Sequence, residues 1–472
     1  MINNEKLYEG GKKKKQELLG EGSYGCAIMP GLNCIGNYNR SNNNVNKIQE
    51  INYYSKNEIE ISEYIKKINN FKNRFVPINK FCIVKFDIFE KNKEIINKCE
   101  NLFEDYSIMN NSEFMNKDYY MFYMKYVKSL SLKKYLYNNF NNNKILYNKY
   151  FYSLYYLLNS IYILNKYNIV HNDLHYDNII YDLNKNIPLI IDFGLSYNHK
   201  NLLKNKNYTK NSLYDLKKIK KHYFDWRLDH YHHLTEKRFI SFIIYNKQLS
   251  KRIDITNDYE KNNLSNEILN IFIDDSYKTI VNSNEIKIIF EDYELKEYNR
   301  VLREFYEKFL PVNDKEKRYV YLYNILNELV PLILKFNDLH SLVCSYLQII
   351  YAKLNYEITN YPINSKDYII IYDFIKQLFK KVLYPNPYYR LSINQFISIL
   401  SFVLKYCENL NNDDLNNEKY IDRFYNKLDI LLKDINYSHD MLYNKNYAYI
   451  DFNLILSKEN IEVIKSLNLT IK

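Results

Sequence analysis

The stretch Ile169–Ile180, with the sequence IVHNDLHYDNII, decides how this 472-residue chain is to be interpreted. It places Asp173 and Asn178 in a short polar segment that apolar residues flank on both sides. A third polar group, Asp192, follows the apolar run Leu189–Ile191 and opens the tripeptide Asp-Phe-Gly. Short apolar runs of this kind are typical of buried strands, so the three polar side chains are predicted in loops next to strand ends.

These residue types suit phosphoryl transfer. The reaction needs a carboxylate that orients the attacking hydroxyl and accepts its proton, and Asp173 fits this role. It also needs oxygen ligands for a Mg²⁺ ion that bridges phosphates, and Asn178 and Asp192 fit this second role. The alternative is a polar turn between two buried strands. The glycine loop upstream argues against that alternative.

Glycine is scarce in this chain, and its distribution indicates a nucleotide. Seven of the eight glycines lie within the first 36 residues, and the eighth is Gly194 of the Asp-Phe-Gly tripeptide. Gly20, Gly22 and Gly25 form the pattern G-x-G-x-x-G in LGEGSYG, whose bare backbone can approach phosphates closely. Taken alone, the same residues also fit a glycine-bearing turn between two strands.

Two other nucleotide-binding loops are excluded by the residues after Gly25. A Rossmann fingerprint continues directly into a helix, whereas the apolar run Cys26–Met29 predicts a strand that meets Pro30 at once. A Walker A loop needs Lys and then Ser or Thr after its last glycine, and this chain has Cys26 and Ala27 there.

The composition bounds the class of partner. Tyr and Lys abound, while Gly and Pro number 8 each and Trp 1, which indicates a strongly AT-biased genome. The net charge of +11 is discounted on the same ground, and the run Lys12–Lys15 is interpreted as a solvated face. No RNA- or DNA-binding motif is present in the sequence, so nucleic acid is not an expected partner.

Cysteines and apolar runs predict a soluble protein of the cytoplasm. The six cysteines lack C-x-x-C spacing and are too sparse for a disulfide scaffold, which favours a reducing compartment. The first residues, MINNEKLYEGGKKKK, have no apolar core and do not resemble a secretory signal. The apolar stretches Tyr150–Leu164 and Tyr319–Leu334 are interrupted by polar residues, and they predict buried helices rather than transmembrane segments.

In the order and type of these motifs the chain resembles a protein kinase over roughly residues 18–400. The resemblance implies an α+β, bilobal fold with a small β-rich N-lobe and a large helical C-lobe. The expected domains are an N-terminal extension at 1–17, the N-lobe at 18–124, a hinge at 125–127, the C-lobe at 128–408, and a linker with a helical tail at 409–472.

The same resemblance assigns an ATP site. The three glycines of the loop, together with Ser23, would cover the phosphates, and Ala27 replaces the branched residue that usually lies over the adenine. The aromatic-rich run Tyr119–Val127 is similar to the strand and hinge that join the two lobes. Met124 then takes the gatekeeper position, and the backbone of Lys125 and Val127 would bond the adenine.

A lysine and a glutamate are expected to position the phosphates. Lys47, in Val-Asn-Lys-Ile, matches the strand lysine that grips the α- and β-phosphates, with Lys56 as the alternative. Its partner should be a glutamate on a helix. Glu58 is preferred because isoleucines follow it at helical spacing, and Glu60 and Glu63 stay open as alternatives.

The catalytic loop departs from the common pattern at two positions. Kinases usually have Arg before the catalytic Asp and Lys two residues after it, whereas this chain has Asn172 and His175. Without that Arg, we expect activity that needs no phosphorylated activation loop. His175 would donate a hydrogen bond toward the γ-phosphate, so transfer is expected to improve as the pH falls toward about 6.

Two further elements match farther along the chain. Residues 225–232, DWRLDHYH, take the place of a helix whose buried aspartate, here Asp229, holds the catalytic loop. In residues 386–392, NPYYRLS, Arg390 would be a structural ion-pair partner. No A-P-E motif follows Asp-Phe-Gly, and an insertion is expected at about 236–367 because the chain is longer there than a minimal kinase needs.

The function expected from the sequence is an ATP- and Mg²⁺-dependent kinase that phosphorylates Ser or Thr of protein substrates. The H-N-D-L-H-x-x-N variant, G-S-Y-G-C and the AT-rich composition are most similar to serine/threonine kinases of large nucleocytoplasmic DNA viruses. This similarity implies action in the host cytoplasm or packaging in virions. Two alternatives stay open: a small-molecule kinase of the aminoglycoside or choline type, and a pseudokinase that serves as a scaffold.

Overall fold

The structure, a computed structural model, describes residues 17–22, 25–29, 44–85, 99, 102, 118–138, 143–203, 213–223, 233–245, 261–262, 266–309, 320–360 and 375–408. The chain divides into two compact units: the first takes in 1–132 and 167–201, and the second 133–166 and 202–472. Of the residues and segments singled out in the sequence, Ser23, Asp229, the extension before Glu17 and the tail at 409–472 lie outside the described residues.

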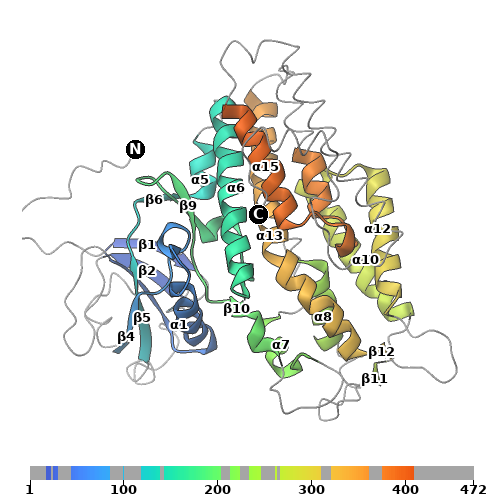
Figure 1. Ribbon diagram of the computed structural model, residues 1–472, viewed down its shortest axis with the longest axis horizontal. Helices are drawn as coiled ribbons and strands as arrows, with labels where there is room; N and C mark the ends of the chain where they lie inside the picture. Colours follow the sequence, from blue (N-terminus) through green and yellow to red (C-terminus); the bar gives the residue numbers. More distant parts are fainter. Residues whose placement is uncertain are drawn as a thin grey trace, which may run out of the picture. The chain divides into compact units, whose positions relative to one another are not determined.

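The first unit is built on a five-stranded antiparallel sheet (Figure 1). In spatial order its strands are β1 (Glu17–Gly22), β2 (Gly25–Met29), β3 (Asn44–Glu50), β5 (Asp118–Lys125) and β4 (Lys80–Lys85). The strands expected at Cys26–Met29 and in Tyr119–Val127 are confirmed as β2 and β5. Because the ladder pairs Lys47 with Ala27 on one side and Phe122 on the other, Lys47 is held in a central strand.

The helix expected around Glu58 is α1 (Tyr53–Lys66). It begins with a capping box in which the Asn52 side chain accepts from the Ser55 N–H and the Ser55 hydroxyl accepts from the Asn52 N–H. Its apolar stripe is confirmed, since Ile61 and Ile65 are buried. The Ile78 N–H donates to the Ser62 hydroxyl at 3.0 Å, which ties the chain after the helix back to it.

Short elements complete the first unit around the catalytic-loop stretch. These are η1 (Phe71–Asn73), β6 (Ser129–Ser131), β7 (Ile169–Val170), η4 (Tyr176–Asn178), β8 (Ile179–Asp182), β9 (Ile187–Ile190), β10 (Tyr197–Asn198) and η5 (His199–Leu202). Strands β6, β8 and β9 form one small sheet, and β7 pairs with β10 in another. The segments at 171–175 and 191–196 therefore lie next to paired strands, as the apolar runs predicted.

A disulfide between Cys26 and Cys99 lies in the core of this unit, where both residues are buried. Around them pack Ile28, Ile48 and Val84. The expectation that the cysteines are reduced is therefore wrong for this pair. The bond joins residues 73 positions apart, and such a pairing leaves no trace in local cysteine spacing.

Removing this disulfide should destabilise the first unit. A native disulfide that closes a loop of this length typically contributes about 4 kcal/mol, chiefly by restricting the unfolded chain. Cys99→Ala is expected to lower the free energy of unfolding by about that amount, measured by equilibrium denaturation. Cys344→Ala is the matched control, because Cys344 is a buried cysteine that takes part in no disulfide. Equal losses in the two variants would contradict the prediction.

The second unit is helical (Figure 1). Its helices are α5 (Leu132–Tyr137), α6 (Asn143–Lys166), α7 (Leu216–His222), α8 (Thr235–Tyr245), α10 (Asn266–Asn282), α11 (Asn284–Lys287), α12 (Asp292–Glu307), α13 (Leu322–Asn360), η6 (Pro387–Tyr389) and α15 (Ile393–Glu408). Residues 375–382 are also helical, and β11 (Lys261–Asn262) pairs with β12 (Val320–Tyr321). No described helix is long and apolar enough to cross a membrane.

Helix α6 contains the buried helix expected before the catalytic loop, and it packs against α13 and α15. The Tyr150 hydroxyl donates to the Tyr346 carbonyl, and the Tyr346 hydroxyl donates to Ser153 at 2.7 Å. The aromatic stripe of α6 is thus core. Helices α10, α11, α12 and α13 and all of α8 but its first residue fall in the range 236–367, where the insertion is expected, and the insertion itself stays a prediction.

Acid should destabilise the second unit through His222 at the end of α7. Burial, with help from Lys221 and Lys237, lowers the pKa of His222 to about 4 from an ordinary value of 6.5. Well above pH 6.5 His222 is neutral in both the folded and the unfolded state. As the pH falls toward 4, it takes up a proton in the unfolded chain while it stays mostly neutral in the folded chain. Stability should therefore fall by about 2 kcal/mol from this group between pH 6.5 and pH 5.

The variant His222→Gln tests this expectation. Between pH 6.5 and pH 5, the free energy of unfolding of the variant should depend less on pH than that of the parent. The difference between the two slopes should correspond to the uptake of about one proton on unfolding. Between pH 8 and 7 the two proteins should show the same dependence. Parallel curves over the whole range would contradict the assignment to His222.

Candidate active site

The glycine loop is the connection between β1 and β2, where Gly22 pairs with Gly25. A Cβ atom on Gly25 would lie 2.0 Å from the Ile48 carbonyl oxygen, so close packing against β3 requires this glycine. A Cβ atom on Gly20 would meet nothing within 4 Å among the described residues. As far as the described residues go, the space beside Gly20 is therefore open, as a loop that covers a ligand requires.

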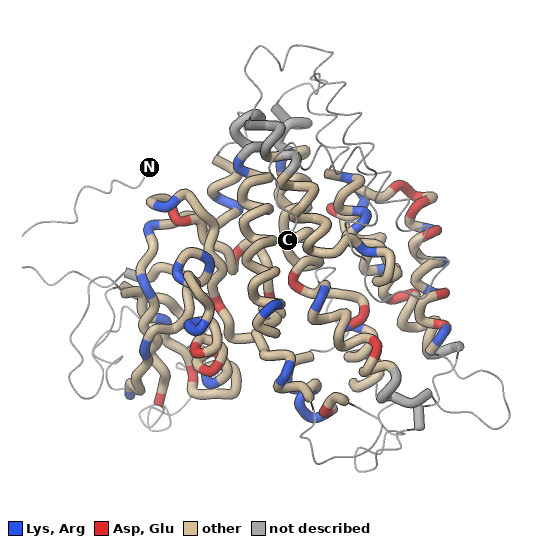
Figure 2. Tube along the Cα trace, in the orientation of Figure 1, with Lys and Arg blue, Asp and Glu red and all other residues tan. Residues whose placement is uncertain are grey.

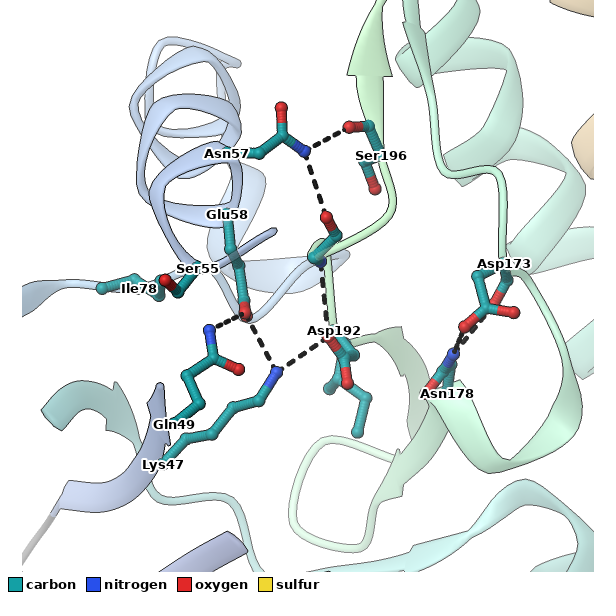
Figure 3. Close-up of polar contacts among 12 residues, drawn as sticks. Lys47, Gln49, Ser55, Asn57, Glu58, Ile78, Asp173, Asn178, Asp192 and Ser196 are labelled. Carbon is teal, nitrogen blue, oxygen red and sulfur yellow. Dashed lines mark hydrogen bonds and ion pairs between the residues drawn. The ribbon is translucent and has the colours of Figure 1, made fainter. Parts of the chain in front are cut away.

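Lys47 joins two carboxylates from distant parts of the chain (Figure 3). Its Nζ lies 3.0 Å from Glu58 Oε2 on α1 and 2.8 Å from Asp192 Oδ1. The other two glutamates make different contacts: Glu60 accepts from Asn201, and Glu63 pairs with Lys66. Of the three candidate partners, Glu58 is the one in contact with Lys47.

The charges of Lys47, Glu58 and Asp192 influence the protonation state of one another. Burial alone would lower the pKa of Lys47, but the charges of Asp192 and Glu58 raise it above its usual value. Burial also opposes ionisation of Asp192, yet Lys47 and the Gly194 N–H hold the pKa of Asp192 below its ordinary value. Burial raises the pKa of Glu58, against the effect of Lys47 and of Gln49, which donates at 3.1 Å. Lys47 is consequently cationic and Asp192 anionic near neutral pH.

Asp173 and Asn178 lie together in the catalytic loop. Asn178 Nδ2 donates to the Asp173 carbonyl at 2.8 Å and to Asp173 Oδ2 at 3.1 Å. The nitrogen of the Asn178 amide therefore faces Asp173, and its side-chain oxygen accepts no hydrogen bond from the described residues. The Asp173 side chain is 38% exposed, so a hydroxyl group from outside can reach it.

His175 extends this group. Its Nδ1 accepts from the Asp177 N–H at 3.3 Å, and its Nε2 lies 3.0 Å from Asn178 Nδ2 and 3.8 Å from Asp173 Oδ2. The ring thus stands beside the loop carboxylate, at the position that the sequence assigns to a hydrogen bond toward a phosphate. That role stays a prediction.

The backbone at Asn172 and Asp192 is left-handed, with φ values of 69° and 61°. Few residues other than glycine adopt this conformation, and Asn and Asp tolerate it best. His171, fully buried, helps to hold the arrangement, because its Nε2 lies 3.0 Å from the Ile191 carbonyl oxygen. The Ile191 N–H in turn donates to the Asn178 carbonyl at 3.0 Å, which holds the backbone just before Asp192 next to the backbone of Asn178.

The oxygen atoms left over fit a hard cation such as Mg²⁺. Asp192 uses Oδ1 on Lys47 and on the Gly194 N–H, and its Oδ2 accepts no hydrogen bond among the described residues. The side-chain oxygen of Asn178 likewise accepts no hydrogen bond among the described residues. Carboxylate and amide oxygens are the ligand types that Mg²⁺ takes in nucleotide sites, so the donor set fits this ion.

The residues expected around an adenine lie at the end of β5 and just after it. Met124 pairs with Val45 of β3 and is partly buried, and Lys125 is exposed. Val127 follows outside the strand, and the Ser129 hydroxyl donates to its carbonyl at 3.2 Å. Ala27 lies opposite Lys47 on the neighbouring strand, so it shares one face of the sheet with that lysine.

Three residues of the site are missing from the sequence-based prediction: Gln49, Asn57 and His171. Gln49 could have been found, because it is two positions after Lys47 on a strand, and alternate residues share a face. His171 lies inside the quoted stretch but carries no predicted role. Asn57 has no local signal, since its partners, Gly194 and Ser196, lie far along the chain.

A comparison with protein-family models matches residues 91–218 to the family described as protein tyrosine and serine/threonine kinase. This range contains the catalytic loop and the Asp-Phe-Gly tripeptide, whereas the glycine loop and Lys47 precede it. A search of curated proteins found no match. The family match supports a place for the chain in the eukaryotic-type protein kinase superfamily. The N-terminal sheet and the helical C-terminal region are those of the α+β, bilobal kinase fold.

Proposed function

We propose that this protein is an ATP- and Mg²⁺-dependent protein kinase that transfers the γ-phosphate of ATP to Ser or Thr hydroxyls. The observation that carries the proposal is the contact of Lys47 with both Glu58 and Asp192. Lys47 and Asp192 are 145 positions apart in the sequence. If the segment around Asp173 were only a polar turn between strands, this contact near the glycine loop would not be expected. The family match supports protein kinase activity in general.

Each group then has one role. Asp173 orients the acceptor hydroxyl and takes its proton, as its position beside Asn178 and its exposure allow. Lys47, positioned by Glu58, binds the α- and β-phosphates. Asn178 and Asp192 would hold Mg²⁺, which when bound would neutralise charge that develops on the phosphates. His175 donates toward the γ-phosphate.

The remaining residues bind the nucleotide. The loop with Gly20, Gly22, Ser23 and Gly25 covers the phosphates, and the backbone at 125–127 bonds the adenine. Ala27 and Met124 line the adenine position. The AT-biased composition and the variant catalytic loop support a virus-encoded enzyme that acts in the host cytoplasm or in virions.

Transfer of labelled phosphate tests the proposal. The protein is incubated with γ-labelled ATP, Mg²⁺ and either generic protein substrates or small acceptors such as amino sugars and choline. Label on protein that requires Mg²⁺ and disappears in Asp173→Ala supports the proposal. Label only on small acceptors, or ATP binding without any transfer, would overturn it in favour of a small-molecule kinase or a scaffold. Phosphoamino-acid analysis of the labelled protein then decides between Ser/Thr and Tyr.

A further inference from the structure

Three successive carbonyl groups after Asp192 each accept a hydrogen bond from a side-chain amide. Asn57 Nδ2 on α1 donates to the Gly194 carbonyl at 3.1 Å and to the Ser196 carbonyl at 2.6 Å. Asn172 Nδ2 donates to the Leu195 carbonyl between them, at 3.1 Å. Two asparagines from different elements therefore hold the same short piece of backbone.

The chemistry of the acceptors fixes how the Asn57 amide must be oriented. Both of its partners are carbonyl oxygens, which only accept, so the NH₂ group and not the oxygen must face them. Both protons of that NH₂ group are then used, one on each carbonyl. Figure 3 shows the Asn57 side chain reaching from α1 to this backbone. The segment is also held from the other side, because the Ser196 hydroxyl donates to the His171 carbonyl at 2.9 Å.

The position of Asn57 links this tether to the charged group of the site. Asn57 directly precedes Glu58 on α1, and Gly194 follows Asp192 by two positions. The tether thus joins the two pieces of chain that carry the carboxylates in contact with Lys47. If α1 moved away from the segment, Lys47 would have to leave one of its two carboxylates.

We propose that Asn57 is a positioning residue that holds α1 and the segment after Asp192 in the arrangement competent for phosphoryl transfer. This inference rests on the proposed kinase function. The amide hydrogen bonds carry no charge and need no phosphate group. They therefore explain how a chain with Asn172 in place of the usual arginine keeps this segment in place without phosphorylation.

Two variants of Asn57 test the role. Asn57→Leu removes both donors at nearly constant size, and Asn57→Asp places a carboxylate against the two carbonyls. Each should lower kcat for protein phosphorylation by about 10-fold, because two hydrogen bonds are lost, while KM for ATP changes less than about threefold. Amide hydrogen exchange at residues 193–198, measured without ATP, should quicken by about 10-fold.

Asn201→Leu is the matched control. Asn201 also donates from the region after Asp192 to α1, at 3.2 Å to Glu60, but on the exposed surface and to a side chain. It should change neither kcat nor exchange at 193–198. Phosphatase treatment of the parent enzyme should leave its activity unchanged.

The outcomes separate this inference from the kinase proposal. Unchanged kcat together with unchanged exchange in both Asn57 variants would overturn the role of Asn57, and so would loss of activity after phosphatase treatment. Absence of transfer in the parent protein would instead overturn the kinase proposal. Exchange at 193–198 would then still report whether the tether holds the segment.

Discussion

Replacing Asp173 by Ala is expected to lower kcat for phosphoryl transfer by about 10³-fold, the effect of removing a group that accepts the proton of the attacking hydroxyl. ATP affinity should change less than about threefold, because binding energy for the nucleotide comes from other groups. The geometry supports this separation. Asn178 loses one partner, Asp173 Oδ2, but keeps its 2.8 Å hydrogen bond to the backbone carbonyl of residue 173. The proposed metal ligand thus stays in place when the carboxylate is removed.

Asp177→Ala is the control for a change of charge in the same loop. Asp177 belongs to η4, its side chain is 62% exposed, and no role in transfer is assigned to it. Initial rates at saturating ATP, with ATP binding measured by calorimetry, distinguish the two variants. The role of Asp173 is refuted if its variant keeps more than about a tenth of the parent kcat, or if Asp177→Ala is impaired to the same degree.

The parts of the site that could be predicted are those written in short patterns of sequence. The loop around Asp173 follows from apolar runs next to polar residues, and the strand that carries Lys47 follows from the resemblance to protein kinases. Helical spacing favours Glu58 over its neighbours, and the contact of Glu58 with Lys47 agrees with that spacing. Periods of 2 and 3.6 residues decide which side chains share a face, so such residues are within reach of the sequence.

The contacts that could not be predicted join residues far apart in the chain. The Cys26–Cys99 disulfide, the bonds of Asn57 to the backbone after Asp192, and the partner of Arg390 all depend on the tertiary fold. None of these contacts has a distinguishing residue next to it in the sequence. In this chain, where asparagine abounds, one asparagine with two backbone partners looks like any other.

Arg390 illustrates this limit. The sequence predicts that it is an ion-pair partner, and this is confirmed, but the partner is Glu236, 154 positions earlier. No A-P-E motif marks a glutamate as the partner of Arg390. In the sequence, position 236 is named only as the start of the expected insertion. In the structure it lies in the first turn of α8, a helix whose residues before Tyr245 are all buried.

The pair is sealed from solvent. The side chains of Arg390 and Glu236 are 1% and 0% exposed, and the Nη1–Oε2 distance is 2.9 Å. The guanidinium also donates to the carbonyls of Tyr384 and Pro385, so all three of its nitrogens are used. Glu236 has less support, because its Oε1 has no hydrogen-bond partner among the described residues. Removing Arg390 would therefore leave a buried carboxylate without its cation.

Arg390→Met is accordingly expected to lower the free energy of unfolding by about 4 kcal/mol, the usual effect of breaking a buried ion pair from one side. The double variant Glu236→Gln/Arg390→Met should be less destabilised than Arg390→Met, since it no longer buries an unpaired charge. Equilibrium denaturation followed by far-UV circular dichroism measures both.

Arg300→Met serves as control, because Arg300 pairs with Glu297 and Glu304 on the exposed face of α12, where charges of both signs alternate (Figure 2). It should leave the denaturation midpoint unchanged. A double variant at least as unstable as Arg390→Met would show that the arginine stabilises the unit by packing on Phe336 and by its carbonyl contacts rather than by neutralising Glu236.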